Sequence, residues 1–98
     1  MKFIILFEDN PDADPGIRQE HTPDHLAFLE RNRANIESAG PLFEAEGSGA
    51  GGIWILDAPD PEVVESLVHE DPFWPTGLRK SYRILQWKQV FADGERQI

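Results

Sequence analysis

The chain has 98 residues, of which 18 are acidic and nine are basic, and its formal charge of −9 disfavours binding to nucleic acid or to an anionic membrane. It contains no cysteine, which excludes disulfides, thiolate metal sites and a cysteine nucleophile. A length of 98 residues with 40% hydrophobic residues fits one folded domain, residues 1–98, and is too short for two independent cores.

The first element is a short apolar segment, residues 3–7, with apolar side chains at odd- and even-numbered positions alike. This pattern predicts a central β-strand that is covered on both faces. The segment is too short for a secretory signal sequence, and no stretch approaches the ~20 apolar residues of a membrane span. We therefore expect a cytoplasmic protein. Residues 8–16 are acidic but lack the ligand order of an EF-hand, so they are interpreted as a solvated loop.

A capping signal predicts the start of the first helix, with Thr22 as its N-cap and Pro23 at its first position. A looser helical turn near Ile17 is an alternative start. Apolar residues then recur with helical spacing as far as Ile36, and Gly40-Pro41 predicts the end of the helix.

Two strands are predicted next, residues 42–46 and residues 53–56, joined by the glycine-rich residues 47–52. These glycines lack the lysine and the following helix of a phosphate-binding loop. We therefore interpret them as the turn of a β-hairpin.

The second helix is predicted to begin at Pro61, with Asp60 as its N-cap. After an aromatic turn, the alternating pattern of residues 79–91 predicts a long last strand. The polar residues 92–98 are expected to form a frayed tail.

This element order, β-α-β-β-α-β, is typical of a ferredoxin-like α+β fold, with a four-stranded antiparallel sheet and two helices on one face. The opposite face of the sheet carries apolar side chains from several strands. A second copy of the chain is the simplest cover for them, so we expect a homodimer through this open sheet face.

Histidine offers the first candidate for chemistry. His21 and His25 are four residues apart, as two metal ligands on one helix face are, but no third ligand has a recognisable spacing, so no metal site is expected. His25 falls near a helix N-terminus, where the dipole favours a neutral imidazole. Such a ring can act as a general base, and the same position also suits a capping or buried structural histidine.

Asp71 offers the second candidate, because it directly follows the predicted second helix. If the fold brings it near His25, its carboxylate can hold the imidazole in one tautomer. Alternatively, Asp71 only caps the turn at Pro72.

Several segments, in this order, resemble the YCII-related (YciI-like) family. They are the opening strand, His25-Leu26-Ala27-Phe28-Leu29, Ala39-Gly40-Pro41-Leu42, Gly51-Gly52-Ile53-Trp54-Ile55, Asp71-Pro72-Phe73 and Arg83-Ile84-Leu85-Gln86-Trp87. The resemblance extends from Met1 to about Phe91 and implies a dimeric ferredoxin-like fold with a His/Asp pair at a pocket, here His25 and Asp71. One branch of the family removes chloride from a chlorinated hydroxyhydroquinone.

Two hypotheses follow from this resemblance, and whether the chain is an enzyme stays open between them. In the first, it is a lyase or hydrolase that needs no cofactor and acts on a small aromatic or phenolic substrate. His25 is then the general base, Asp71 orients it, and the pocket is formed by Phe28, Phe73, Trp74, Arg79 and Arg83. In the second, the chain is a non-catalytic dimeric module that binds a small ligand or a protein.

Overall fold

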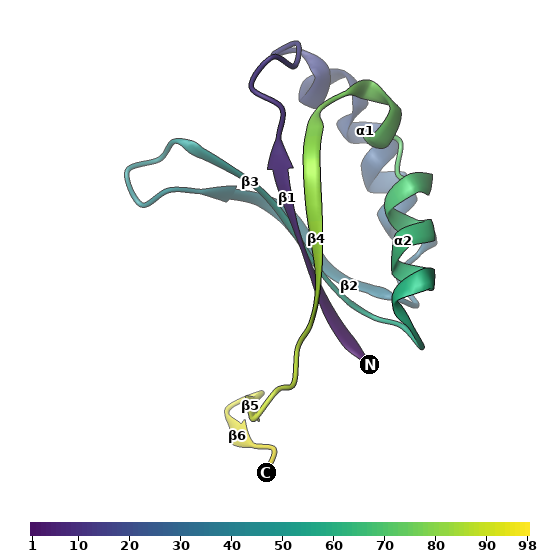
Figure 1. The fold of residues 1–98 in the computed structure, drawn as a ribbon, viewed down its shortest axis with the longest axis vertical. Helices are drawn as coiled ribbons and strands as arrows, with labels where there is room; N and C mark the ends of the chain where they lie inside the picture. Colours follow the sequence, from purple (N-terminus) through teal and green to yellow (C-terminus); the bar gives the residue numbers. More distant parts are fainter.

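The fold is a four-stranded antiparallel sheet with two helices packed on one of its faces, as the computed structural model of residues 1–98 shows (Figure 1). The strand order is β2-β3-β1-β4, so β1 and β3 are central, and the expected ferredoxin-like fold is confirmed. The elements are β1 (Lys2–Asp9), α1 (Ile17–Arg31), β2 (Ile36–Phe43), β3 (Gly49–Asp57), α2 (Pro61–Glu70), the short 3₁₀ helix η1 (Trp74–Thr76), β4 (Arg79–Gln86), β5 (Phe91–Ala92) and β6 (Glu95–Arg96).

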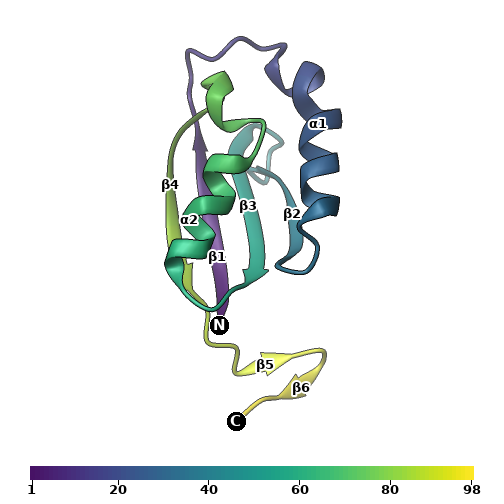
Figure 2. The same cartoon turned by 90° about the vertical axis from the view of Figure 1, so that its right-hand side faces the viewer.

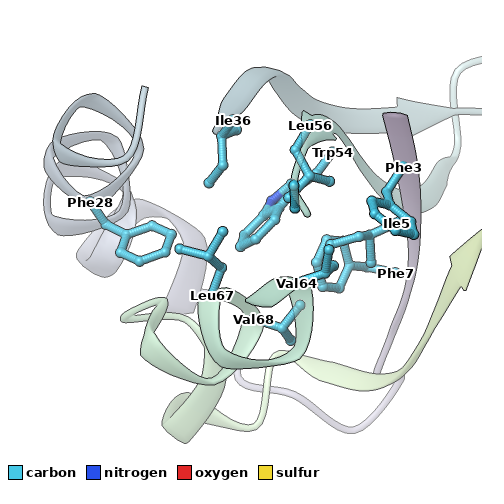
Figure 3. Packing of buried hydrophobic residues seen from close by; sticks show 11 residues of the cluster. Phe3, Ile5, Phe7, Phe28, Ile36, Trp54, Leu56, Val64, Leu67 and Val68 are labelled. Carbon is cyan, nitrogen blue, oxygen red and sulfur yellow. The ribbon is translucent and has the colours of Figure 1, made fainter. Parts of the chain in front are cut away.

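The hydrophobic core lies between the sheet and the helices (Figure 3). Strand β1 presents Phe3, Ile5 and Phe7 to the helices, and each of these residues is at most 4% exposed. Trp54 of β3 lies beside Phe28 of α1, with their ring centroids 5.9 Å apart. Burial of each such side chain stabilises the fold by about 1.5–3 kcal/mol. Helix α2 completes the core with Val64, Leu67 and Val68.

The other face of the sheet has no helix over it (Figure 2). Because side chains alternate along a strand, the residues between the buried ones point to this open face. Ile4 pairs with Ile55 on one side and Leu85 on the other, and Leu6 pairs with Ile53. These five apolar residues are half-buried in the single chain.

Helix α1 begins earlier than its capping signal predicts. It starts at Ile17, after the N-cap Gly16, so Pro23 lies inside the helix and not at its first position. A proline there removes one hydrogen bond to the carbonyl four residues earlier, which belongs to Gln19. Gln19 is exposed, so water can reach this carbonyl and the helix tolerates the proline.

Helix α1 also ends earlier, at Arg31, and Ile36 begins β2 instead of completing the helix. Asn32 terminates the helix with its side-chain amide, which donates to the carbonyl of Phe28 at 2.8 Å. Gly40 and Pro41 therefore lie inside β2 and do not end α1. Because β2 is an edge strand, a proline without an N–H group can be accommodated there.

Strand β3 begins at Gly49, so Gly51 and Gly52 belong to the strand and not to the hairpin turn. The φ angle of Gly51 is +90°, and a Cβ atom at this position would lie 1.9 Å from the carbonyl oxygen of Phe7 on β1. Only glycine fits this close approach of the two central strands.

The second helix begins as predicted, with the Asp60 carboxylate accepting the N–H of Val63 at 3.1 Å. Neither helix is long and apolar enough to cross a membrane. The last strand is shorter than predicted, because β4 ends at Gln86. The expected frayed tail instead forms a small hairpin, β5–β6, around the turn Asp93-Gly94, where both residues have positive φ.

Candidate active site

Asp71 is the most deeply buried charged residue of the chain, with an exposed fraction of 0%. It lies at the C-cap of α2, where the chain turns back toward the sheet. Its Oδ1 atom accepts the backbone N–H of Phe73 at 3.0 Å and lies 2.9 Å from Nδ1 of His25. Its Oδ2 atom accepts a hydrogen bond from Nη1 of Arg79 at 2.8 Å.

These contacts determine the charge state of Asp71. Burial alone would raise the pKa of its carboxyl group, but the hydrogen bonds from His25 and Phe73 and the charge of Arg79 together hold the pKa below its usual range. Asp71 is therefore ionised near neutral pH and can only accept hydrogen bonds. Nδ1 of His25 must then carry a hydrogen, which leaves Nε2 of a neutral ring with a free lone pair.

His25 is placed by α1 and held by an aromatic neighbour. Its ring lies 4.4 Å from the ring of Phe73, measured between centroids, at an interplanar angle of 35°. The side chain is 12% exposed, so the imidazole is largely shielded while one edge stays accessible. Because Nδ1 faces buried Asp71, the accessible polar atom is Nε2.

The accessible edge of His25 opens into a cavity of about 270 Å³ between α1 and the sheet. One face of α1 lines it, with residues at helical spacing. The sheet contributes aromatic walls, Phe7 from β1 and Trp54 from β3, and Phe73 closes the end near His25. The residues from α1 are Arg18, Thr22, His25, Leu26 and Leu29.

Arg79 supplies positive charge to this cavity. Its guanidinium lies 3.8 Å from the ring centroid of Phe7, and its side chain is only 7% exposed. Burial lowers its pKa and the Asp71 carboxylate opposes that effect, but an arginine stays protonated near neutral pH. Only Nη1 bonds to a protein group, and no buried side-chain nitrogen of the chain lacks a partner. The other guanidinium nitrogens of Arg79 therefore reach solvent in the cavity.

A second arginine, Arg18, also lines the cavity and was not predicted from the sequence. Its Nη2 atom donates to Oδ2 of Asp9 at 2.6 Å, and both residues are partly exposed. The spacing Arg18, Thr22 and His25 is regular for a helix, so a correct helix start at Ile17 would have placed all three on one face.

The structure brings four of the seven predicted site residues together: His25, Asp71, Phe73 and Arg79. The remaining three lie elsewhere. Phe28 is buried in the core, and Trp74 packs against His69 with centroids 4.7 Å apart.

Arg83, the third, pairs with Leu6 and points to the open face of the sheet. His21 is also outside the cavity; its Nε2 atom lies 3.9 Å from a carboxylate oxygen of Glu20. No three His, Asp or Glu side chains are grouped closely enough to hold a metal ion.

Fold and cavity together define a ferredoxin-like α+β protein with a His–Asp pair at a small aromatic pocket. The chain belongs to the family of the YCII-related domain, which matches residues 1–88. It is also similar to the solved structure of 5-chloro-2-hydroxyhydroquinone dehydrochlorinase from Burkholderia phenoliruptrix AC1100, in complex with 2,5-dihydroxybenzoquinone. The two chains are 30% identical, with a TM-score of 0.75, and the match covers 90% of this chain and 94% of the other. No curated protein matches the chain.

Proposed function

We propose that the chain is a lyase that removes a leaving group from a small hydroxylated aromatic ring, with His25 as its general acid and base. The observation that carries this proposal is the 2.9 Å contact between Nδ1 of His25 and Oδ1 of Asp71. An ionised acceptor at Nδ1 leaves Nε2 free to accept a proton, and it stabilises the imidazolium that forms.

The chemistry needs only proton transfers by His25. Nε2 accepts a proton from a ring hydroxyl and returns it to the ring carbon that carries the leaving group, which becomes tetrahedral. The leaving group then departs with its bonding electron pair, while Nε2, neutral again, accepts the proton of a second hydroxyl and later releases it to water. The ring becomes a quinone, and the net change is the loss of one acid molecule, HX, without an external oxidant.

The cavity suits such a substrate in size and in charge. Its volume of about 270 Å³ lies just below the usual 300–1,000 Å³ of ligand pockets, which favours a single ring over a larger molecule. Phe7, Trp54 and Phe73 provide aromatic surfaces for that ring. The free nitrogens of Arg79 can bind the oxygen that becomes negatively charged when a hydroxyl is deprotonated.

The similarity to the dehydrochlorinase supports this substrate class, because that protein is named for a chlorinated hydroxyhydroquinone and was solved with a dihydroxybenzoquinone. For this chain the first compound to test is therefore 5-chloro-2-hydroxyhydroquinone, followed by hydroquinones with other halogens or fewer hydroxyls. Chloride release and quinone absorbance measure the reaction directly.

The matched variants are His25→Ala and His21→Ala. His25→Ala is expected to lower turnover by about 10²–10⁴-fold, the usual contribution of a general acid–base group. His21→Ala is the control, since His21 lies on the same helix but outside the cavity. Equal turnover in the two variants contradicts the proposal. Ligand binding without any chloride release would favour the alternative hypothesis, a non-catalytic binding module.

A further inference from the structure

Arg18 is a charged side chain of the cavity that the proposed reaction does not use. It lies on α1 seven residues before His25, so two helical turns, or roughly 10 Å, separate the two residues along one face of the helix. Its Nη2 atom donates to Oδ2 of Asp9, whereas its Nε and Nη1 atoms make no hydrogen bond to the protein. Part of this guanidinium is therefore free to bind a ligand at a distance from the general base.

Arg18 and Arg79 reach the cavity from opposite walls, one from α1 and the other from β4. Arg79 pairs across the sheet with Asp9, which is also the partner of Arg18. The pKa of Arg79 is lowered mainly by burial and to a smaller extent by the positive charge of Arg18, so the two guanidinium groups lie close enough to repel each other. A negatively charged ligand in the cavity would relieve this repulsion.

The wall of the cavity carries more positive than negative charge. Its charged residues are Arg18, Arg79 and Asp9, because Asp71 is fully buried and does not line the cavity. The whole chain has a formal charge of −9 and only nine basic residues, so two arginines in one small cavity reverse the sign of the charge locally. A chain that repels anions over most of its surface thus offers them a place here.

The free donors of Arg18 suit a carboxylate. A guanidinium presents its N–H groups in a planar fork, which matches the two oxygens of that group. The ion pair between Arg18 and Asp9 is partly exposed, with side chains 41% and 34% exposed, so it contributes little to stability and can admit a second carboxylate. Because about 270 Å³ favours a single ring, the carboxylate is best placed as a substituent of that ring.

We propose that the substrate is a ring acid, a hydroxybenzoate with a leaving group, whose carboxylate is bound by Arg18. The inference rests on the proposed function for the ring hydroxyl that faces Nε2 of His25. The carboxylate takes no part in the loss of HX, and it holds the ring with one hydroxyl at the general base. Arg79 remains available for the oxygen that becomes negatively charged.

Two unreactive ligands of nearly equal shape test this proposal, 2,5-dihydroxybenzoate and its uncharged amide, 2,5-dihydroxybenzamide. Isothermal titration calorimetry is expected to show that the wild type binds the acid at least tenfold more tightly than the amide. Arg18→Gln should weaken binding of the acid by roughly 10- to 100-fold, the loss of one or two charge-assisted hydrogen bonds, and leave binding of the amide unchanged. Arg31→Gln makes the same charge change on an exposed residue of α1 outside the cavity and should change neither affinity.

Several results would overturn this inference. The wild type could bind both ligands equally or neither at millimolar concentration, Arg31→Gln could weaken the acid as much as Arg18→Gln does, or Arg18→Gln could weaken both ligands alike. The last result would mean that Arg18 only shapes the cavity. These outcomes are separate from the test of the lyase. Chloride release from 5-chloro-2-hydroxyhydroquinone without a preference for the acid removes only the ring acid, whereas a preference for the acid without any dehalogenation removes only the lyase.

Discussion

Nδ1 of His25 and Oδ1 of Asp71 lie 2.9 Å apart, although 46 positions separate the two residues in the sequence. The contact joins the middle of α1 to the end of α2. Asp71 is itself fixed by the Phe73 amide and by Arg79, so it cannot rotate away from the imidazole. Under the proposed function Asp71 is thus a positioning residue, and its removal should affect both catalysis and folding.

The variant Asp71→Asn tests this double role. An amide carries no charge to stabilise the imidazolium of His25, so turnover should fall by about 10²–10⁴-fold. The same change leaves Arg79 buried without its counter-charge, which typically costs about 3–5 kcal/mol of unfolding free energy. Urea denaturation measures this loss. The double variant Asp71→Asn/Arg79→Met removes the buried charge and should regain most of the stability. If its loss of unfolding free energy equals the sum of the losses in the two single variants, Asp71 and Arg79 do not stabilise each other.

Stability should also depend on pH through Asp71. The pKa of its carboxyl group is lower in the folded chain than the usual value of about 3.9, so the unfolded state binds protons more readily. The contribution of Asp71 is therefore complete above the unfolded pKa and is lost as the pH falls through the folded pKa. Urea midpoints measured from pH 5 down to pH 2 should decrease for the wild type. In Asp71→Asn the decrease of the urea midpoint toward low pH should be smaller. An equal decrease in the variant and the wild type would mean that Asp71 is not the source of this pH dependence.

Part of the fold can be predicted from the sequence because some signals are local. Asp60 and Pro61 set the start of α2 by capping and by a preset φ angle, whatever surrounds them. The two prolines that misled the prediction depend on tertiary context. Pro23 is tolerated inside α1 because Gln19, whose carbonyl it leaves unpaired, is an exposed residue, and Pro41 is tolerated in β2 because that strand is an edge.

The site is less predictable, because its residues depend on how the elements meet. No spacing rule connects His25 with Asp71, and only the family resemblance indicated the pair. Arg79 and Arg83 are four positions apart, so a regular strand would point both to one face. A register shift opposite them, between Glu8 and Asp9 of β1, separates the two arginines. Arg79 then packs on Phe7 at the cavity, while Arg83 faces the open side.

This separation gives a matched pair of variants, Arg79→Lys and Arg83→Lys. Lysine keeps the charge but loses the planar group that stacks on Phe7 and the nitrogens that face the cavity. Arg79→Lys should therefore raise KM by roughly 10- to 100-fold, the loss of one or two hydrogen bonds to a charged oxygen. Steady-state kinetics with 5-chloro-2-hydroxyhydroquinone measures this effect. Arg83→Lys is the control and should leave KM unchanged. An unchanged KM in Arg79→Lys as well would show that charge alone, and not the geometry of the Arg79 guanidinium, attracts the substrate.

Gly51 gives a prediction about the frame that holds the cavity. A Cβ atom at this position would lie 1.9 Å from the Phe7 carbonyl oxygen, and the φ angle of +90° is strained for any other residue. Gly51→Ala should therefore lower the unfolding free energy by roughly 2–4 kcal/mol. Gly49→Ala is the control, because no atom lies within 4 Å of its added methyl group, and it should change stability by less than about 0.5 kcal/mol. Urea denaturation of both variants compares them directly. The ring of Phe7 also packs against the Arg79 guanidinium, so displacement of β1 in Gly51→Ala should reduce turnover as well. Full activity in this variant would mean that the cavity tolerates movement of β1.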